Sequence, residues 1–286
     1  MNGIVIVDKP AGWTSQDVTA RLRRVFSTRR IGHGGTLDPM ATGVLPVFVG
    51  RATRGVEFFE HAEKAYEAVL RLGITTDTED ISGTVLEEKP VSVTQEQFLE
   101  ILPRFRGEIM QVPPMYSALK VDGQKLCDLA RKGKEVVRQP RPITIHELEC
   151  LCFEGNTAHL RVRCSKGTYI RTLCKDIGAA LGCGGCMEAL RRVSAGSYTI
   201  GEAVPLAQLL ETDKPEAFLR GVDTMFAQYP KVVLTANQEK RCRNGNSFSL
   251  PLEPGTYRAY SQSGEFLMLA KLEDGVMSTI KSFFEV

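Results

Sequence analysis

One acidic residue stands alone in a basic, glycine-rich part of this 286-residue chain. Asp38 is the only aspartate or glutamate between Val18 and Val56, and arginines lie on both sides of it in the sequence. A lone carboxylate in such surroundings suits attack on a sugar carbon, or stabilisation of a cationic one, beside phosphates. The competing interpretation is structural, because an aspartate followed by a proline often caps and begins a short helix.

A second polar segment, residues 164–171, is expected to join a strand to the N-terminus of a helix. Its hydroxyls and the helix N-terminus could bind phosphate, or they could only cap the helix. Arg171 lies beside the apolar stripe of that helix, one residue after Ile170 and three before Cys174, so packing does not explain an arginine there.

The cysteine and histidine spacing argues against a metal site. Cys183 and Cys186 have ligand spacing, but no second pair of this kind follows, and Cys150 and Cys152 are spaced wrongly. The four histidines are scattered. We therefore predict that the protein holds no metal ion.

Hydrophobic periodicity indicates which elements position these residues. The run 4–7 predicts a buried strand, Ser15 is expected to cap a helix that follows, and residues 32–46 are expected to form one long loop. Further elements are predicted as a strand over 66–72, a helix opened by a capping box at 94–97 and stopped at 107, a short helix ending at 133, a hairpin of 143–153 with 157–164, and a helix over 170–181.

This mixture of strands and helices lacks regular βαβ alternation, which predicts an α+β fold with a largely antiparallel sheet. After residue 230, short strand-like runs alternate with turn signals such as Asn244-Gly245. We therefore predict a large domain over 1–229 and a small β-rich domain over 230–286.

Composition and charge narrow the class of protein. Apolar residues make up 43% and charged residues 24%, as in a globular protein, and no apolar run is long enough to span a membrane. The N-terminus lacks the features of a signal peptide, so we expect a cytoplasmic protein with reduced cysteines. The net charge is only +2, yet residues 1–54 carry eight basic against three acidic residues, and 117–180 carry twelve against seven. These two blocks could form a basic face for a phosphate backbone, or ordinary solvated surfaces.

Several segments together resemble the TruB family of pseudouridine synthases, in its stand-alone bacterial form. They lie in one order over roughly residues 3–200: Val7-Asp8-Lys9-Pro10, Gly32-His33, Gly35-Thr36-Leu37-Asp38-Pro39, Ala41-Thr42-Gly43, Tyr66, Arg71-Leu72-Gly73, Thr76-Asp77-Thr78 with Asp80, 114–120 (Pro-Met-Tyr-Ser-Ala-Leu-Lys), 164–171 and Leu190-Arg191-Arg192. Position 34 is glycine where this family often has threonine, which puts one hydroxyl contact in doubt. The resemblance implies that residues 1–229 form the catalytic domain, with an insert near 117–140 as in bacterial members. The C-terminal region resembles, more weakly, the small PUA-type RNA-binding module.

The resemblance implies an isomerase that converts uridine to pseudouridine at position 55 in the T-loop of tRNA, after flipping the base out of its stack. It implies that Asp38 is the nucleophile, that Tyr66 packs on the uracil, and that Arg171 pairs with Asp38. The other residues expected to bind substrate are His33, Lys9, Asp80, Tyr169 and Leu190. Lys132, Lys134 and Arg138 are expected to contact the RNA backbone. No cofactor, metal, membrane or obligate protein partner is expected.

Two other classes of function remain open at this point. A hydrolytic nucleosidase would also use a lone carboxylate, but it would release free uracil. An RNA-binding protein that only assists folding would use the same basic face and would not need Asp38.

Overall fold

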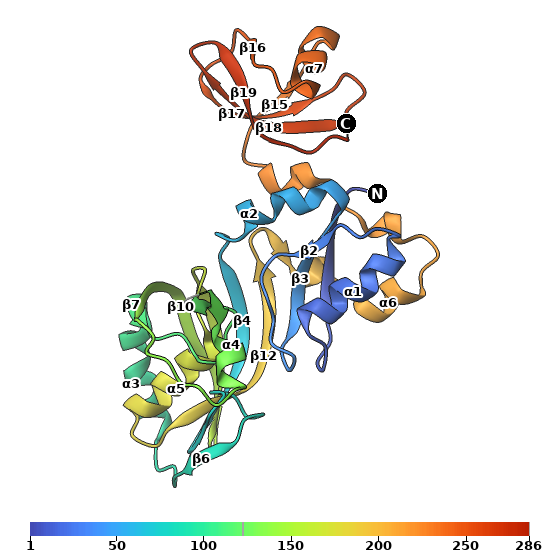
Figure 1. Ribbon diagram of the computed structural model, residues 1–286. Coiled ribbons are helices and arrows are strands. Elements are labelled where there is room, and N and C mark those ends of the chain that lie inside the picture. The colour runs from blue at the N-terminus through green and yellow to red at the C-terminus, as the bar shows by residue number, and fades with distance from the viewer. Residues whose placement is uncertain (122, 286) are drawn as a thin grey trace. The chain divides into compact units, whose positions relative to one another are not determined.

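The computed structural model describes residues 1–121 and 123–285. The chain forms two compact units (Figure 1). The first unit consists of Met1–Pro39, Leu45–Glu60 and the chain from Gly201 onward, and the second of Met40–Val44 and His61–Ile200. The predicted division into residues 1–229 and 230–286 stays a prediction.

A mixed sheet forms the framework, which confirms the predicted α+β class. Among the described residues it has ten strands, in the order β14-β1-β3-β12-β4-β11-β10-β7, with β2 beside β3 and β13 beside β12. Most neighbouring strands are antiparallel, whereas β1 and β14, and β3 and β12, run parallel. The strands are β1 (Gly3–Lys9), β2 (Ile31–His33), β3 (Thr42–Val49), β4 (Lys64–Leu72), β7 (Gly107–Gln111), β10 (Arg141–Glu154), β11 (Thr157–Cys164), β12 (Gly185–Ala195), β13 (Tyr198–Thr199) and β14 (Val204–Pro205).

In the first unit, helix α1 (Ser15–Val25) packs its apolar stripe inward. The expected cap at Ser15 is wrong by one residue. Thr14 caps the helix: its side chain accepts from the Asp17 N–H, and the Asp17 carboxylate accepts from the Thr14 N–H. Ser15 is buried, and its hydroxyl instead accepts from the Leu37 N–H of the neighbouring loop. The remaining helices of this part are η1 (Gly50–Gly55), α2 (Val56–Phe59), η3 (Ile200–Glu202), α6 (Leu206–Glu211), η4 (Pro215–Phe218) and η5 (Val222–Phe226).

The expectation of one long loop over residues 32–46 is also wrong, since strands β2 and β3 pair across a connection of only residues 34–41. The glycines and prolines that suggested a loop lie inside or beside strands. Gly43, at φ +101°, is required in β3 because a Cβ there would lie 2.2 Å from the Arg192 carbonyl oxygen. The Pro46 carbonyl, in the middle of β3, accepts from the Gly34 N–H at 2.8 Å.

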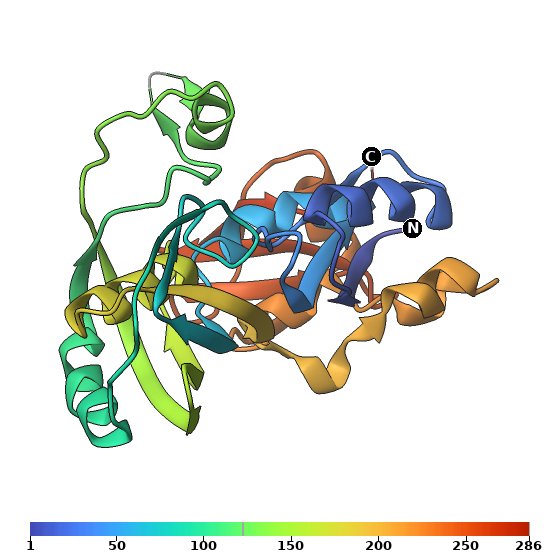
Figure 2. The same ribbon diagram turned by 90° about the horizontal axis from the view of Figure 1, so that it is seen from below.

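In the second unit, the predicted strand over 66–72, the capping box at Thr94 and Gln97, the hairpin and the helix after residue 169 are confirmed. Helix α5 (Ile170–Ala180) packs on β12 and β4. Figure 2 shows the segment around α4 (Leu126–Ala130) extending away from the strands of its unit. The other elements are β5 (Ile74–Thr76), β6 (Val85–Glu88), α3 (Gln95–Ile101), η2 (Leu102–Phe105), β8 (Lys120–Val121) and β9 (Gln124–Lys125).

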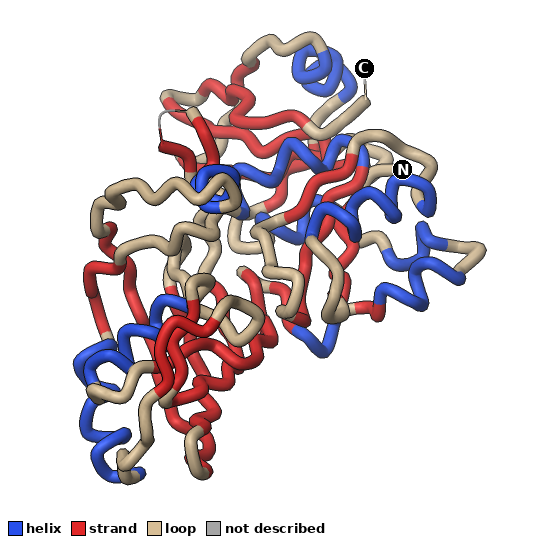
Figure 3. The backbone as a smooth tube through the Cα atoms, turned by 60° about the horizontal axis from the view of Figure 1, so that its bottom comes forward, coloured by secondary structure: helices blue, strands red, loops and turns tan. Residues whose placement is uncertain are grey.

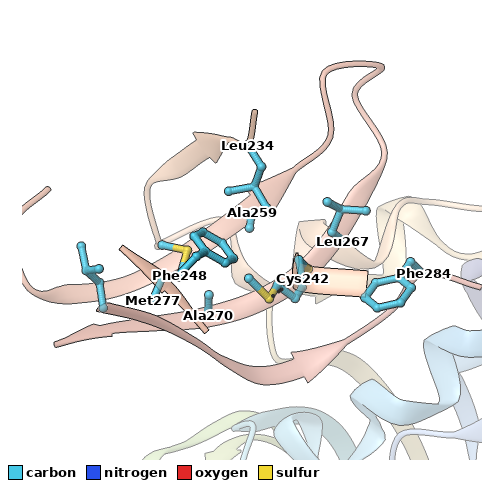
Figure 4. Packing of buried hydrophobic residues seen from close by; sticks show 10 residues of the cluster. Leu234, Cys242, Phe248, Ala259, Leu267, Ala270, Met277 and Phe284 are labelled. Atoms are coloured by element: carbon cyan, nitrogen blue, oxygen red, sulfur yellow. Dashed lines mark hydrogen bonds between the residues drawn. The ribbon is translucent and has the colours of Figure 1, made fainter. Parts of the chain in front are cut away.

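The end of the chain builds a small sheet with its own core. Its strands follow the order β15-β17-β18-β19-β16. They are β15 (Lys231–Val233), β16 (Phe248–Ser249), β17 (Gly255–Tyr260), β18 (Phe266–Glu273) and β19 (Val276–Ser282), with helix α7 (Ala236–Arg243) beside β16. Leu234, Leu267 and Met277 are among the residues that fill its core (Figure 4). The β-rich character predicted after residue 230 is confirmed.

Figure 3 shows the strands of the large sheet and of this small sheet in red, with the helices in blue. Across the described residues, we find no helix that is both long and apolar enough to span a membrane.

Candidate active site

The loop that carries Asp38 is fixed on both sides of that residue. The Ser15 hydroxyl accepts from the Leu37 N–H at 2.9 Å and donates to the Leu37 carbonyl at 3.2 Å. On the other side, the Pro39 carbonyl accepts from the Gly12 N–H at 2.8 Å. Asp38 itself is half-buried. The backbone is therefore held on both sides of Asp38, and this residue stays partly accessible.

Lys9 contributes to the same loop from strand β1. Its side chain is completely buried, and its ammonium donates to the carbonyls of Pro10, Trp13 and Pro39 at 2.9, 2.6 and 3.3 Å. A buried ammonium needs such partners, because an unsatisfied charge in the interior is costly. Lys9 thus fastens the turn after β1 to the residue that follows Asp38. Its predicted contact with substrate stays a prediction.

His33 ends strand β2, five residues before Asp38. Its Nε2 lies 3.4 Å from the side-chain amide of Gln16 on helix α1. The structure therefore ties Lys9 to the loop that carries Asp38, and it places His33 beside α1 at the start of that loop. The alternative in which Asp38 and Pro39 begin a helix is wrong, since residues 39–40 form only a turn.

In the second unit, Arg171 lies in the first turn of α5 and is only 5% exposed. Its guanidinium donates to the carbonyls of Thr78 and Tyr116 at 3.0 and 2.8 Å, and its Nε lies 3.9 Å from the Asp80 carboxylate. A guanidinium spreads its charge over several donors in a planar fork, which suits such a multi-partner site. Arg171 therefore ties two loops to the start of α5.

Asp80 is held by a hydroxyl-rich turn. One carboxylate oxygen accepts from the Thr78 hydroxyl, the Ser82 N–H and the Ser82 hydroxyl, at 3.0, 3.0 and 2.5 Å. The Thr76 hydroxyl donates to the Asp80 carbonyl at 2.6 Å. The structure thus brings Asp80 and Arg171 together, with the Asp80 carboxylate fixed before any substrate arrives.

Tyr66 and Leu190 share one face of the sheet. In the pairing of β4 with β12, Leu190 lies opposite Ala68, and Tyr66 is two residues from Ala68 along β4. Residues two apart on a strand point to the same side, so Tyr66 and Leu190 are diagonal neighbours. Both are nearly buried, at 8% exposed. They offer a flat aromatic surface beside an aliphatic one.

The buried cysteines near these residues are poor nucleophiles. Burial raises the pKa of Cys164 and of Cys186 to about 11, and it also raises the pKa of Cys174. Thiols with such pKa values stay protonated at neutral pH. Within residues 1–121 and 123–285, no group of three or more histidine, cysteine or acidic side chains is arranged to hold a metal ion.

Lys132 and Lys134 are exposed on the insert, after α4. Arg138 differs from them, because its guanidinium donates to the Pro113 carbonyl at 3.2 Å and pairs with Glu135 at 3.2 Å. Its side chain is only 19% exposed. The two lysines are therefore open to an RNA backbone, whereas Arg138 holds the insert to the chain before it.

Sequence reasoning missed several polar residues that hold the site. The Glu79 carboxylate accepts from the Thr172 hydroxyl and the Lys175 ammonium of α5, both at 2.5 Å. Glu79 is 7% exposed and has a φ of +65°. Neither its burial nor its left-handed backbone leaves a signal in a single sequence, because an acidic residue between polar neighbours usually indicates a solvated turn.

Position 34 is glycine because a side chain there would collide with two aromatic rings. A Cβ at Gly34 would lie 2.5 Å from Cδ1 of Phe59 and 3.1 Å from Cε2 of Phe48. The Phe48 and Phe59 rings meet edge to face, with centroids 5.9 Å apart. Phe59 therefore occupies the volume that a side chain at position 34 would need.

We expect Gly34→Thr to lower the free energy of unfolding by about 1–3 kcal/mol, as overpacking does. Phe59→Ala alone should cost about 3–5 kcal/mol through its cavity. The double variant should lose less than the sum of the two, because each change relieves the other. Denaturant unfolding of the four proteins measures this coupling. Additivity within about 0.5 kcal/mol would show that the two positions do not compete for space.

Two family models match this chain. A family model described as TruB family pseudouridylate synthase (N terminal domain) matches residues 23–170, and one described as tRNA pseudouridylate synthase B C-terminal domain matches residues 171–226.

Curated relatives match nearly the whole chain. A protein of Dechloromonas aromatica, named tRNA pseudouridine synthase B, is 46% identical over 265 residues, which cover 92% of this chain and 89% of that protein. A protein of Clostridium kluyveri with the same name is 40% identical over 289 residues, covering 99% of this chain and 100% of that protein.

Solved structures share the fold. A chain in a crystal structure of a Cbf5-Nop10-Gar1 complex aligns with a TM-score of 0.75 at 25% identity, covering 99% of this chain and 85% of that one. Since a family model spans over half of the residues and relatives above 40% identity span nearly all of them, the chain belongs to the TruB family of pseudouridine synthases.

Proposed function

We propose that this protein isomerises uridine to pseudouridine at position 55, in the T-loop of tRNA. Membership of the family supports an isomerase of this kind, and its curated relatives carry the name tRNA pseudouridine synthase B. The observation that carries the proposal is the fixed Asp38: the backbone on both sides is hydrogen-bonded while the carboxylate stays partly accessible.

The reaction is a rearrangement within one nucleotide. The bond between C1′ of the ribose and N1 of uracil breaks, the base turns, and a bond forms between C1′ and C5, whose proton is lost while N1 gains one. Nothing is oxidised or reduced and no group leaves the RNA. We therefore propose that the protein works without a cofactor, a metal ion or an obligate protein partner.

Each side chain takes a role that its setting suits. Asp38 acts as the nucleophile. The ring of Tyr66 packs on the detached uracil, with Leu190 and Tyr169 bounding the base, and Tyr66 takes part in removing the C5 proton. Arg171 pairs with Asp38 during catalysis and keeps it ionised, while Asp80 steadies Arg171. His33, on the Asp38 loop, fills the space that the flipped base leaves.

Two basic surfaces are proposed to bind the RNA backbone. One is the insert with Lys132 and Lys134, which Arg138 holds in place through the Pro113 carbonyl. The other is the end of α1 and the turn after it. This surface carries five exposed arginines that form no ion pair or side-chain hydrogen bond within the described residues: Arg21, Arg23, Arg24, Arg29 and Arg30. Five like charges within ten residues repel one another, and a polyanion relieves that repulsion.

The small C-terminal sheet is proposed to be a PUA-like RNA-binding module that adds affinity rather than chemistry. We propose that the protein acts in the cytoplasm, where its substrate is made.

Asp38→Asn should abolish turnover and retain tRNA binding, because the amide keeps the shape of the carboxylate but is not a nucleophile. The test is tritium release from tRNA labelled at C5 of uridine, with binding measured by filter retention. A rate above roughly a thousandth of wild type would contradict the nucleophile assignment, since losing a covalent route should cost several kcal/mol.

Arg171→Lys should be partly active, with the acidic limb of its pH–rate profile moved to higher pH, because a weaker cationic partner lets the carboxylate protonate more readily as pH falls. Arg171→Met should be far worse. Single-turnover rates across pH measure both effects. If both variants match wild type in rate and in profile, Arg171 is not paired with the catalytic carboxylate.

Salt dependence tests the two RNA surfaces. Each phosphate contact adds about 0.7–0.9 to the slope of log K against log salt. The pair Lys132→Ala/Lys134→Ala, and separately Arg24→Ala/Arg29→Ala, should each flatten that slope by about 1.5. A control with exposed Arg104→Ala/Lys214→Ala should keep the wild-type slope. An unchanged slope in a test pair assigns that surface to solvent.

A further inference from the structure

Gln111 is a buried polar residue that the proposed chemistry does not use. It ends strand β7, at one edge of the large sheet, and is only 3% exposed. Its side-chain amide makes two hydrogen bonds to a single residue. The Tyr169 N–H donates to Gln111 Oε1 at 2.9 Å, and Gln111 Nε2 donates to the Tyr169 carbonyl at 3.1 Å.

This pair of bonds fixes the start of helix α5. Tyr169 is the residue before the helix, and its own side chain makes no capping hydrogen bond. Its carbonyl also accepts from the Leu173 N–H at 3.0 Å, in the first turn. With both its N–H and its carbonyl held by Gln111, the Tyr169 backbone has little freedom to rotate. Of the twenty side chains, only those of glutamine and asparagine carry an amide donor and acceptor side by side.

The segment that follows Gln111 contacts α5 a second time, at Arg171. After Gln111 the chain runs through Pro113 and Pro114, which restrict the backbone, to Tyr116, whose carbonyl accepts from Arg171. Residues 111–116 therefore form a strap, tied at one end to the backbone of residue 169 and at the other to the side chain of residue 171.

The strap also reaches the insert. The next residue, Ser117, accepts at its carbonyl from the Cys127 N–H of α4, at 3.0 Å. A change in the position of Gln111 would therefore displace both the start of α5 and the base of the insert.

We propose that Gln111 is a positioning residue for the reaction: its amide sets the Tyr169 backbone and, through the strap and the first turn of α5, the direction of the Arg171 guanidinium. This inference rests on the proposed function. A small misplacement of a group that acts in catalysis can cost about a hundredfold in rate.

The test compares two variants of Gln111 with a matched control. Gln111→Met keeps the length of the side chain and removes both hydrogen bonds. Gln111→Glu keeps the acceptor for the Tyr169 N–H and loses the donor to the Tyr169 carbonyl. The control is Gln97→Met, because the Gln97 side chain accepts from the Thr94 N–H at the start of α3, where it also steadies a helix start.

Single-turnover pseudouridine formation should fall by about ten- to a hundredfold in Gln111→Met and Gln111→Glu. The tRNA dissociation constant, measured in the Asp38→Asn background, should stay within about twofold of the value without the Gln111 change. Gln97→Met should lower the melting temperature and leave the rate unchanged. A wild-type rate in either Gln111 variant, or a loss of rate explained by weaker binding, would overturn the proposal.

Hydrogen exchange separates this proposal from the function on which it rests. The amides of residues 169–173 should exchange faster in Gln111→Met than in wild type, whatever reaction the protein catalyses. If wild type forms no pseudouridine but the exchange result holds, the proposed function fails, while Gln111 still fixes the Tyr169 backbone. If exchange is unchanged, Gln111 does not fix the Tyr169 backbone and the proposal is wrong. Should Gln111→Met fail to fold, Gln111→Glu decides the matter by the same two measurements.

Discussion

The guanidinium of Arg171 is buried, and arginine keeps its charge at any pH a protein meets. That charge must be satisfied where it lies, because removing the partners of a buried ion costs several kcal/mol. Carbonyls from two loops, those of Thr78 and Tyr116, and the Asp80 carboxylate supply the partners. The Arg171 side chain consequently holds both loops against the first turn of α5.

The Asp38 loop is organised in a similar way by a different charge. The Lys9 ammonium is buried on three carbonyls, one of which belongs to Pro39. In both places a buried cation is satisfied by backbone carbonyls, and the Asp80 carboxylate is fixed by neighbouring hydroxyls. Lys9 and Arg171 thus hold loops that have no regular secondary structure of their own.

Much of the fold follows from sequence patterns because burial follows periodicity. The alternation along 157–164 and the stripe from Ile170 to Leu181 predicted β11 and α5 directly. The loop expected over 32–46 failed because glycine and proline there serve close packing: Gly43 makes room for the Arg192 backbone, and Pro46 lies within a strand. The cap at α1 is Thr14 and not Ser15, because Asp17 completes a capping box with Thr14 while the Ser15 hydroxyl bonds Leu37.

The candidate site was predictable to the extent that a family resemblance names residues. The resemblance assigns roles to Asp38, Tyr66 and Arg171, and these roles stay predictions. Gln111 and Glu79 were not, because a buried amide and a buried carboxylate with left-handed backbone look like ordinary polar residues until their partners, Tyr169 and the polar side chains of α5, are known.

We propose that this protein rearranges one uridine of tRNA without losing the base. The most direct measurement is incubation of the purified protein with an unmodified tRNA transcript, followed by mapping of pseudouridine by carbodiimide modification and primer extension, together with an assay for free uracil. We predict a single new stop assigned to position 55 and no uracil release. Free uracil with an abasic site would show a hydrolase instead, and an unaltered transcript would contradict the proposed isomerisation.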